Sequence, residues 1–335
     1  MAQVAPATAQ VALGIDIGGT NTVFGFLTPD GRLLGRTVIP TRAREGGERL
    51  MARICQQAVA MLREAPAPVV GIGVGSAGQI DPRTGVCVFA NDNLPGWTGM
   101  DIRGRLAAAT GLPVYVDNDA NVAALGEQRF GAGRGVANLV CITLGTGVGG
   151  GIISQGRLLT GHRGLAGEVG HIIVHAGGDP CPCGLRGCLE AYASATAIVR
   201  RTREALPAYP DSRLHQVEPL TARAVFAAAA AGDPCGERIV AETARYLAVG
   251  LASVINLLDP ELILIGGGVA QAGEPFLDRV RAHLESWAVT RGRARIARCA
   301  LGEDAGVVGA AALVFAAAPE AGAPEAGAPG GTAAP

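Results

Sequence analysis

A histidine and three cysteines lie close together in the second half of the chain. His171 is followed by Cys181, Cys183 and Cys188, in a segment whose glycines allow tight turns. One imidazole and three thiolates are enough for a closed tetrahedral Zn²⁺ site. The Cys-x-Cys spacing is tighter than in common zinc fingers, and buried free thiols are the alternative. Because core packing does not account for three cysteines so near one another, we expect these four residues to bind a structural zinc ion.

Three glycine-rich turns each follow residues typical of a β-strand. They are Gly18-Gly19-Thr20, Gly145-Thr146-Gly147 and Gly266-Gly267-Gly268. Exposed backbone N–H groups in such turns form anion-binding concavities, and glycine lets the backbone approach a ligand closely. Each alone is more often only a turn, but three together favour a nucleotide in a cleft between two domains. Asp16 precedes the first turn, where it either caps the turn or faces phosphate through Mg²⁺.

Polar side chains also gather where a predicted strand meets a predicted helix. The strand 114–116 is followed by Asp117, Asn118, Asp119 and, after one alanine, Asn121. The carboxyl ends of strands are where α/β folds bind ligands. A carboxylate there could accept the proton of a substrate hydroxyl, which suits phosphoryl transfer. Helix capping is the alternative. Since two acids and two amides exceed the needs of one cap, we expect a polar ligand here.

The composition narrows the chemistry further. The 335 residues carry a formal net charge of −1, and all 28 basic residues are arginine, because the chain has no lysine. Near-neutral charge argues against nucleic-acid binding, which needs a basic surface. Without lysine there is no Walker-type phosphate loop and no Schiff-base catalysis. Phosphate binding must then come from glycine backbone, threonine, arginine and a metal ion.

Strands alternate with helices along the chain, which predicts the α/β class. Apolar spacing and capping residues predict helices near 46–63, 119–130, 189–205, 221–230, 235–258 and 304–317. Strands are predicted at 69–74, 114–116 and 261–265. The segments 14–34 and 141–159 share the order strand, Gly-Thr turn, strand, turn, strand. We therefore expect two similar α/β halves, with chance likeness of two hairpins as the alternative.

The remaining features bear on compartment and termini. We expect no membrane span, because no segment offers about 20 uninterrupted apolar residues. The start lacks the basic and apolar regions of a signal peptide, and the scattered cysteines fit a cytoplasmic protein. We expect residues 1–10 to be flexible. Residues 318–335 consist of small residues, Pro and Glu without apolar periodicity, so we expect a disordered tail.

These motifs together resemble the ROK family of sugar kinases and repressors. The similar segments are 16–21, 117–121, 144–151, 167–171 and the cysteine segment 181–190, and the likeness runs from about 11 to 317. The resemblance implies a two-domain, actin-like (ribonuclease H-like) α/β fold with an interdomain cleft. It implies a smaller domain over 11–117, joined by the helix 304–317. A larger domain over 118–303 would carry the zinc loop 171–188.

The resemblance also implies roles for individual residues. Asp119 resembles the catalytic base that activates the 6-hydroxyl of a hexose for attack on ATP. The residues similar to sugar-binding positions are Gly78, Asn93, Asn118, Asp119, Glu168, His171 and Glu190. The residues similar to positions that bind ATP and Mg²⁺ are Asp16, Gly18, Gly19, Thr20, Asn21, Thr143, Gly145, Thr146, Gly147 and Gly267. The zinc ligands implied are His171, Cys181, Cys183 and Cys188.

Two positions depart from the family pattern. Ser76-Ala77-Gly78-Gln79 stands where these enzymes usually have Pro-Gly-Pro, so both prolines are missing. Asn21 stands where many relatives have lysine.

The resemblance implies an ATP-dependent kinase that forms glucose 6-phosphate, most like the zinc-containing glucokinases of the family. Kinases for fructose, mannose or an N-acetylhexosamine are the alternative within this class. A sugar-responsive repressor is the alternative from another class, but residues 1–17 leave no room for a helix-turn-helix. Asp16 and Asp119 argue against a non-catalytic sugar binder, and the cysteine cluster argues against a polyphosphate-dependent enzyme. The expected partners are a hexose, ATP and further copies of the chain in a homodimer or homotetramer.

Overall fold

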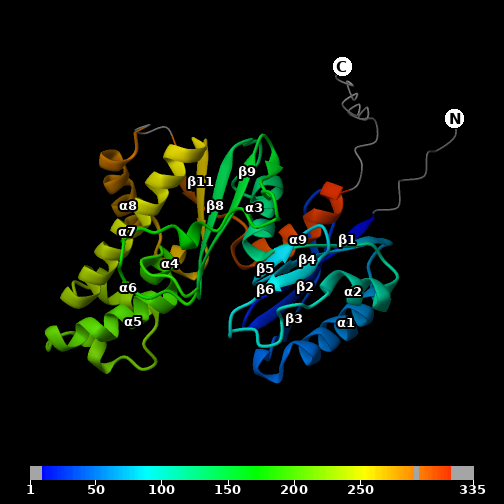
Figure 1. Cartoon of the computed structure of the whole chain (residues 1–335), viewed down its shortest axis with the longest axis horizontal. Coiled ribbons are helices and arrows are strands. Elements are labelled where there is room, and N and C mark those ends of the chain that lie inside the picture. The colour runs from blue at the N-terminus through cyan, green and yellow to red at the C-terminus, as the bar shows by residue number, and fades with distance from the viewer. Residues whose placement is uncertain (1–9, 290–293, 318–335) are drawn as a thin grey trace, which may run out of the picture.

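Two five-stranded sheets of the same topology form the framework of the protein (Figure 1). The structure is a computed structural model that describes residues 10–289 and 294–317. The first sheet has the order β3-β2-β1-β4-β7 and the second the order β10-β9-β8-β11-β12. In each sheet the first strand along the chain pairs antiparallel with the second and parallel with the next central strand. The predicted pair of similar α/β halves is therefore confirmed.

The strand bounds agree with the apolar runs of the sequence. The first sheet consists of β1 (Val11–Ile17), β2 (Asn21–Leu27), β3 (Leu33–Pro40), β4 (Val69–Ser76) and β7 (Val114–Asn118). The second consists of β8 (Leu139–Leu144), β9 (Val148–Ser154), β10 (Arg157–Leu158), β11 (Leu262–Gly266) and β12 (Arg295–Arg298). A separate hairpin of β5 (Gln79–Asp81) and β6 (Val86–Phe89) follows β4.

Helices cover both faces of each sheet. On the first sheet, α1 (Gly47–Arg63) and α2 (Ile102–Thr110) share one apolar core with the strands, and α9 (Ala305–Ala317) packs on the other face. On the second sheet, α3 (Asp119–Phe130) covers one face. The other face packs against the helical layer of α4 (Glu190–Ala193), α5 (Ala195–Ala205), α6 (Ala222–Ala230), α7 (Pro234–Leu258) and α8 (Glu274–Trp287). We call each sheet with its covering helices a lobe.

The inner helices α3 and α9 hold the two lobes together through glycine. A Cβ atom on Gly309 of α9 would lie 1.7 Å from the carbonyl oxygen of Val122 on α3. On the other side of α9, a Cβ on Gly73 of β4 would lie 1.8 Å from the carbonyl oxygen of Ala310. Real Cβ atoms do not approach so closely, so these glycines let α9 sit tightly between α3 and the first sheet.

The predicted helices are found close to their expected bounds, with one correction. The helix expected over 189–205 is divided at Ser194, whose extended backbone ends α4 and whose hydroxyl oxygen accepts a hydrogen bond from Ala197 N. This serine therefore acts as an N-cap inside an otherwise helical pattern. The expectations for residues 1–9 and for the tail 318–335 concern residues outside the described ones.

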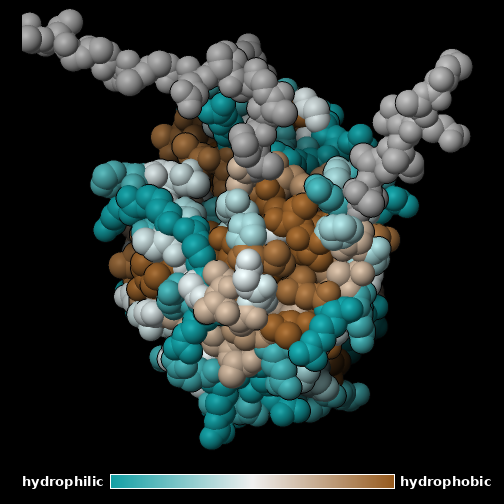
Figure 2. Space-filling model, turned by 90° about the vertical axis from the view of Figure 1, so that its right-hand side faces the viewer, coloured by the Kyte–Doolittle hydropathy of each residue, from teal (hydrophilic) through white to brown (hydrophobic). Residues whose placement is uncertain are grey.

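The long helix α7 is apolar enough to cross a membrane by length and composition alone. It is the only such helix in the described part of the chain, and 61% of its most apolar 18-residue window is buried. Its buried residues belong to the large core of the second lobe. This burial identifies α7 as a core helix. Figure 2 views the molecule from the right-hand side of Figure 1, where the first lobe lies, and shows apolar residues bordered by hydrophilic ones.

Candidate active site

The first glycine turn lies at the end of β1 and presents its tip to solvent. Gly18 N donates to Asn21 O (3.0 Å), which closes the turn, and Asn21 begins β2. Thr41 holds the turn from beneath, because its hydroxyl donates to Gly18 O (2.7 Å) and its N–H to Thr20 O (2.8 Å). Gly19 and Thr20 are exposed. Their backbone and the threonine hydroxyl are therefore available to a ligand.

The second and third glycine turns meet at the end of β8. A Cβ atom on Gly267 would lie 2.4 Å from Leu144 O, and the φ of Gly267 is +82°, so only glycine fits there. The second turn is anchored to α5, because Ala195 N donates to Gly145 O (2.8 Å) and the Thr196 hydroxyl donates to Thr146 O (2.9 Å). Thr143 lies half-buried near the end of β8.

A surface pocket opens beside the second turn. Its volume is about 590 Å³, and its walls include Thr146, Thr196 and Leu220. Arg200 and Arg203 of α5 also line it. A pocket of this size is in the range that holds a small organic ligand. A ligand placed there would touch the tip of the Gly145-Thr146-Gly147 turn.

Two carboxylates interact near the junction of the lobes. Burial raises the pKa of Asp16 to about 7, and the charge of Asp119 adds to the increase. Burial also raises the pKa of Asp119, with a further contribution from the charge of Glu168. Asp16 comes from β1 and Asp119 from the first turn of α3. Neighbouring acids of this kind hold a proton or a cation between them.

The N-terminus of α3 is capped by a neighbour of Asp119. The side-chain oxygen of Asn118 caps α3 by accepting from Ala120 N (2.9 Å) and Asn121 N (3.3 Å). Asp117 is buried and accepts from Asn118 N (2.7 Å) and Asn121 Nδ2 (2.8 Å). Asp119 Oδ1 accepts from Ala120 N (2.9 Å). Asn118 therefore serves as the N-cap of α3.

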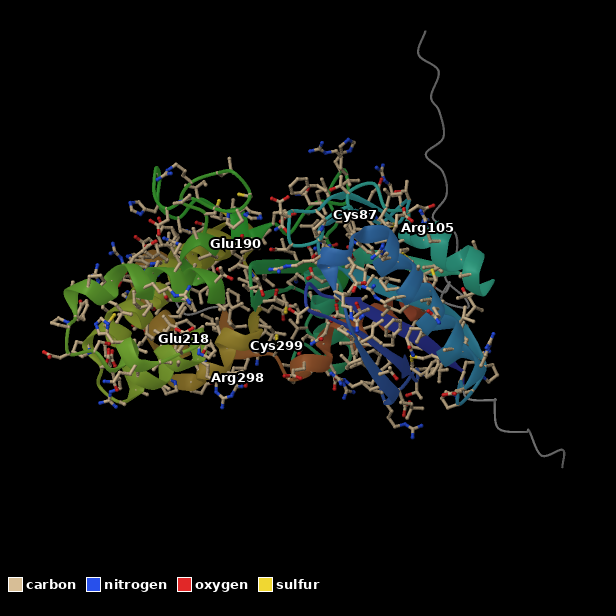
Figure 3. All side chains as sticks on the ribbon, turned by 90° about the horizontal axis from the view of Figure 1, so that it is seen from below. Cys87, Arg105, Glu190, Glu218, Arg298 and Cys299 are labelled. Atoms are coloured by element: carbon tan, nitrogen blue, oxygen red, sulfur yellow. The ribbon has the colours of Figure 1, made fainter. Side chains whose placement is uncertain are left out.

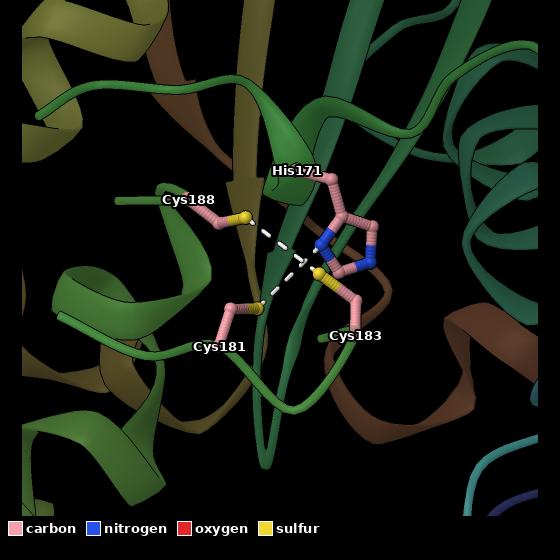
Figure 4. Close-up of side chains that lie close together, drawn as sticks. All are labelled: His171, Cys181, Cys183 and Cys188. Carbon is pink, nitrogen blue, oxygen red and sulfur yellow. Dashed lines mark hydrogen bonds between the residues drawn. The ribbon is translucent and has the colours of Figure 1, made fainter. Parts of the chain in front are cut away.

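The four predicted metal ligands converge on one point (Figure 4). Their donor atoms all lie within 4.8 Å of one another. Cys183 Sγ lies 3.7 Å from Cys188 Sγ, and Cys181 Sγ lies 3.8 Å from His171 Nδ1. Sulfur atoms about 2.3 Å from a tetrahedral Zn²⁺ lie roughly 3.8 Å apart, so this donor set fits zinc.

The cluster adjoins two of the predicted sugar ligands. His171 Nδ1 faces the sulfurs, while His171 Nε2 lies 3.9 Å from Glu168 Oε2. Glu190 extends to the second glycine turn: its Oε2 accepts from Val148 N (2.9 Å), and its Oε1 lies 3.6 Å from Cys181 Sγ. Glu190 belongs to the lobe that carries Glu218 and Arg298, whereas Cys87 and Arg105 mark the other lobe (Figure 3).

Two further predicted sugar ligands come from the first lobe. Gly78 O accepts from Asn118 Nδ2 (3.0 Å), so the loop after β4 is tied to the start of α3. Asn93 is exposed in the segment between β6 and α2, where its N–H donates to Asn91 Oδ1 (3.1 Å). Among the described residues, no hydrogen bond joins Asn93 to the other predicted sugar ligands. The structure thus brings Gly78 and Asn118 together.

Two residues of this region were not predicted from the sequence. Gln79 Nε2 donates to Glu168 Oε1 (3.1 Å), across the boundary between the lobes. Gly306 lies against Asp16, since a Cβ there would be 2.2 Å from Asp16 Oδ2. The departure at 76–79 and the small residues of 305–312 were visible in the sequence, but neither pattern names the partner that each residue contacts.

Comparison with known proteins identifies the family. Residues 12–317 match the model of the ROK family. A glucokinase of Halalkalibacterium halodurans is 42% identical over 314 residues, which cover 90% of this chain and 94% of the relative. The structure of a ROK hexokinase from Thermus thermophilus superposes with a TM-score of 0.80 at 38% identity, covering 91% of this chain and 98% of that chain.

A second solved structure carries ligands. It is a ROK family glucokinase from Streptomyces griseus in complex with glucose and AMPPNP, with a TM-score of 0.79 and 37% identity. The match covers 90% of this chain and 98% of that chain. These matches also confirm the expected two-domain, actin-like α/β fold. This chain therefore belongs to the ROK family.

Proposed function

We propose that this protein transfers the γ-phosphoryl group of ATP to the 6-hydroxyl of glucose, giving glucose 6-phosphate and ADP. The observation that carries the proposal is the closeness of Asp16 and Asp119 beside the first glycine turn: Asp16 pairs with Gly75 across β1 and β4, and a Cβ on Gly75 would lie 3.6 Å from Asp119 Cα. Phosphoryl transfer needs a base for the attacking hydroxyl, neutralised phosphate charge and in-line positioning. The glucokinase relatives at similar length support the same reaction.

Asp119 is the catalytic base in this proposal. A general base works best when its pKa lies toward the working pH, and burial raises the pKa of Asp119 in that direction. Its position at the start of α3 leaves an oxygen for the sugar hydroxyl, because Asn118 already caps the helix. Asp119 would take the proton as the hydroxyl oxygen attacks the γ-phosphorus.

ATP would lie across the glycine turns. The phosphate groups face the turns of Gly18, Gly19 and Thr20 and of Gly145, Thr146 and Gly147, with Gly267, Thr143 and Asn21 beside them. The pocket next to Thr146 would take the nucleoside, because it opens from the same turn. Asp16 would hold Mg²⁺, because a carboxylate that lies near a phosphate group needs a cation between the two negative charges. When bound, Mg²⁺ neutralises the charge that develops on the phosphate oxygens.

The sugar would lie between the lobes. Its ligands in this proposal are Gly78, Asn93, Asn118, Asp119, Glu168, His171 and Glu190. Zn²⁺ on His171, Cys181, Cys183 and Cys188 would be structural, because its four donors close the coordination sphere. The metal would fix the ring of His171 through Nδ1 and leave Nε2 for a hydroxyl.

The domain bounds and the setting of the enzyme are part of the proposal. The smaller domain comprises 11–117 with the helix 304–317, and the larger comprises 118–303; the packing of α9 on the first sheet supports this division. None of the eight cysteines forms a disulfide, which supports a reducing compartment such as the cytoplasm. Sedimentation of the purified chain would test the proposed homodimer or homotetramer.

A coupled assay of ADP release tests the function directly. The purified protein is supplied with ATP, Mg²⁺ and one sugar at a time: glucose, fructose, mannose, N-acetylglucosamine and N-acetylmannosamine. We expect the highest kcat/KM with glucose and no turnover when Mg²⁺ is chelated. A higher kcat/KM with another hexose would assign that sugar instead, and no turnover with any of them would refute the kinase.

A further inference from the structure

The loop between β4 and β5 contacts the opposite lobe through a side chain that the family pattern does not predict. Gln79 begins β5 in the first lobe, and Glu168 precedes the short helix 169–171 in the second. Gln79 Nε2 donates to Glu168 Oε1 at 3.1 Å. This hydrogen bond joins a neutral amide donor to a carboxylate, which makes it stronger than a bond between two neutral groups.

The backbone around Gln79 is built so that the side chain reaches Glu168. Gly78 has a φ of +100°, and a Cβ on it would lie 2.8 Å from Phe89 O, so the turn before β5 requires glycine. Asn118 Nδ2 holds the same residue through Gly78 O (3.0 Å). On the other lobe, Gly164 packs against Pro82 of the hairpin, since a Cβ on Gly164 would lie 2.2 Å from Pro82 Cδ. Both ends of the contact are therefore supported by backbone packing.

The contact leaves the carboxylate of Glu168 able to bind a ligand. Glu168 Oε1 accepts from Gln79, and Oε2 lies 3.9 Å from His171 Nε2. A carboxylate has about four lone-pair sites, so it can accept from Gln79 and from sugar hydroxyls at the same time. The side chain of Glu168 is 44% exposed and would otherwise sample several rotamers. Fixing one rotamer before the sugar arrives lowers the entropy lost on binding.

We propose that Gln79 is a positioning residue that orients the carboxylate of Glu168 for the sugar from the opposite lobe. This inference rests on the proposed hexokinase function and deepens it. Gln79 acts through Glu168 and not on the reacting atoms. Its loss therefore weakens sugar binding and leaves the chemical step and ATP binding largely unchanged.

The test compares two substitutions at one position. Gln79→Leu removes the donor at similar size, and Gln79→Glu places a second carboxylate next to Glu168. We expect Gln79→Leu to raise the KM for glucose by about 2- to 13-fold, the cost of ordering one long side chain on binding. We expect Gln79→Glu to raise it further, because like charges repel. The kcat and the KM for ATP should change less than about twofold. The reason is that the substitution weakens sugar binding equally in the ground state and in the transition state.

Three measurements separate positioning from a structural role. Arg83→Ala removes the ion pair with Asp81 in the same hairpin without touching Glu168, and it should leave the KM for glucose unchanged. In a Glu168→Gln background, Gln79→Leu should add little, because the two residues act as a unit. Direct titration of glucose in the absence of ATP should reproduce the loss of affinity.

The outcomes distinguish this inference from the function on which it rests. If the wild-type protein is active and Gln79→Leu keeps its KM for glucose, the positioning role is refuted and the kinase stands. Equal losses in Gln79→Leu and Arg83→Ala refute it as well, since they would indicate disruption of the hairpin. If the wild-type protein neither binds nor phosphorylates any hexose, both proposals are wrong.

Discussion

The charge of Asp119 acts on Asp16 across the junction of the lobes, adding to the burial that raises the pKa of Asp16 to about 7. One residue comes from the first sheet and the other from the helix that covers the second sheet. Neither lobe alone therefore contains both carboxylates. Two acids held together in this way favour a bound cation or a shared proton, and the lobes must be correctly packed for either to bind.

Asp119→Asn should lower kcat by about 10²- to 10⁴-fold, the contribution of a positioned general base. Glucose binding, measured by titration, should change little, because the amide is nearly isosteric with the carboxylate. Asp117→Asn is the matched control two residues away: Asp117 Oδ1 accepts two hydrogen bonds, and an amide oxygen can accept them as well. Normal turnover by Asp119→Asn would show that another group takes the proton.

Without Mg²⁺, the stability of the protein should fall as the pH rises from about 4 to about 7. The pKa of Asp16 is about 7 in the folded protein, against an ordinary pKa of 3.8 for aspartate, so the folded state binds more protons within this window. Stability decreases with pH wherever the folded state holds the additional proton. Thermal unfolding in buffers across this range, prepared without Mg²⁺, measures the slope.

Asp16→Asn and Mg²⁺ provide the comparison for that pH series. Because an amide does not titrate, the variant should show a smaller decline than the wild-type protein between the same two pH values. Mg²⁺ should raise the unfolding temperature of the wild-type protein near neutral pH and have less effect on the variant. A variant whose pH profile matches that of the wild type would exclude Asp16 as the source of the slope.

Cys183→Ser should remove the metal and destabilise the protein by several kcal/mol, since structural zinc contributes on the order of 10 kcal/mol in small domains. Elemental analysis should give about one zinc per wild-type chain, as expected for one four-ligand site. The KM for glucose should rise, because His171 loses its support next to Glu168. Cys55→Ser is the control, as Cys55 is a half-buried cysteine of α1 outside the cluster. Full stability of a zinc-free wild-type protein would contradict the site.

Two glycines of α9 should respond differently to alanine. Gly306→Ala places a Cβ 2.2 Å from Asp16 Oδ2, so it should displace that carboxylate and raise the Mg²⁺ concentration needed for activity. Gly309→Ala places its Cβ 1.7 Å from Val122 O, where α9 crosses α3. It should lower the free energy of unfolding by about 1–3 kcal/mol, as overpacking does.

Unfolding in urea and the Mg²⁺ dependence of the initial rate separate these two effects. Alanine is otherwise the better helix former, by about 1 kcal/mol over glycine, so any loss reports the close contact and not helix propensity. If Gly306→Ala is as active as the wild type at low Mg²⁺, Asp16 does not depend on that contact.

The sequence by itself determined the class of fold and most of the elements. Continuous apolar runs predicted the central strands, because both faces of these strands are buried, and helical spacing and capping residues predicted α1, α3, α6, α7 and α9. The pattern gave no sign that the helix near 189–205 is divided, since Ser194 interrupts it only through its backbone and cap. The four predicted metal ligands could be recognised from the sequence, because one histidine and three cysteines at such close spacing are typical of a metal site.

Only the tertiary structure decided which residues that are distant in the sequence contact one another. It showed that Asn118 caps α3, which the sequence of three adjacent polar residues could not decide. It also placed Gln79 against Glu168 and Gly306 against Asp16. Local periodicity records which face of an element is buried, whereas these contacts depend on how two lobes pack around α3 and α9, far apart in the chain.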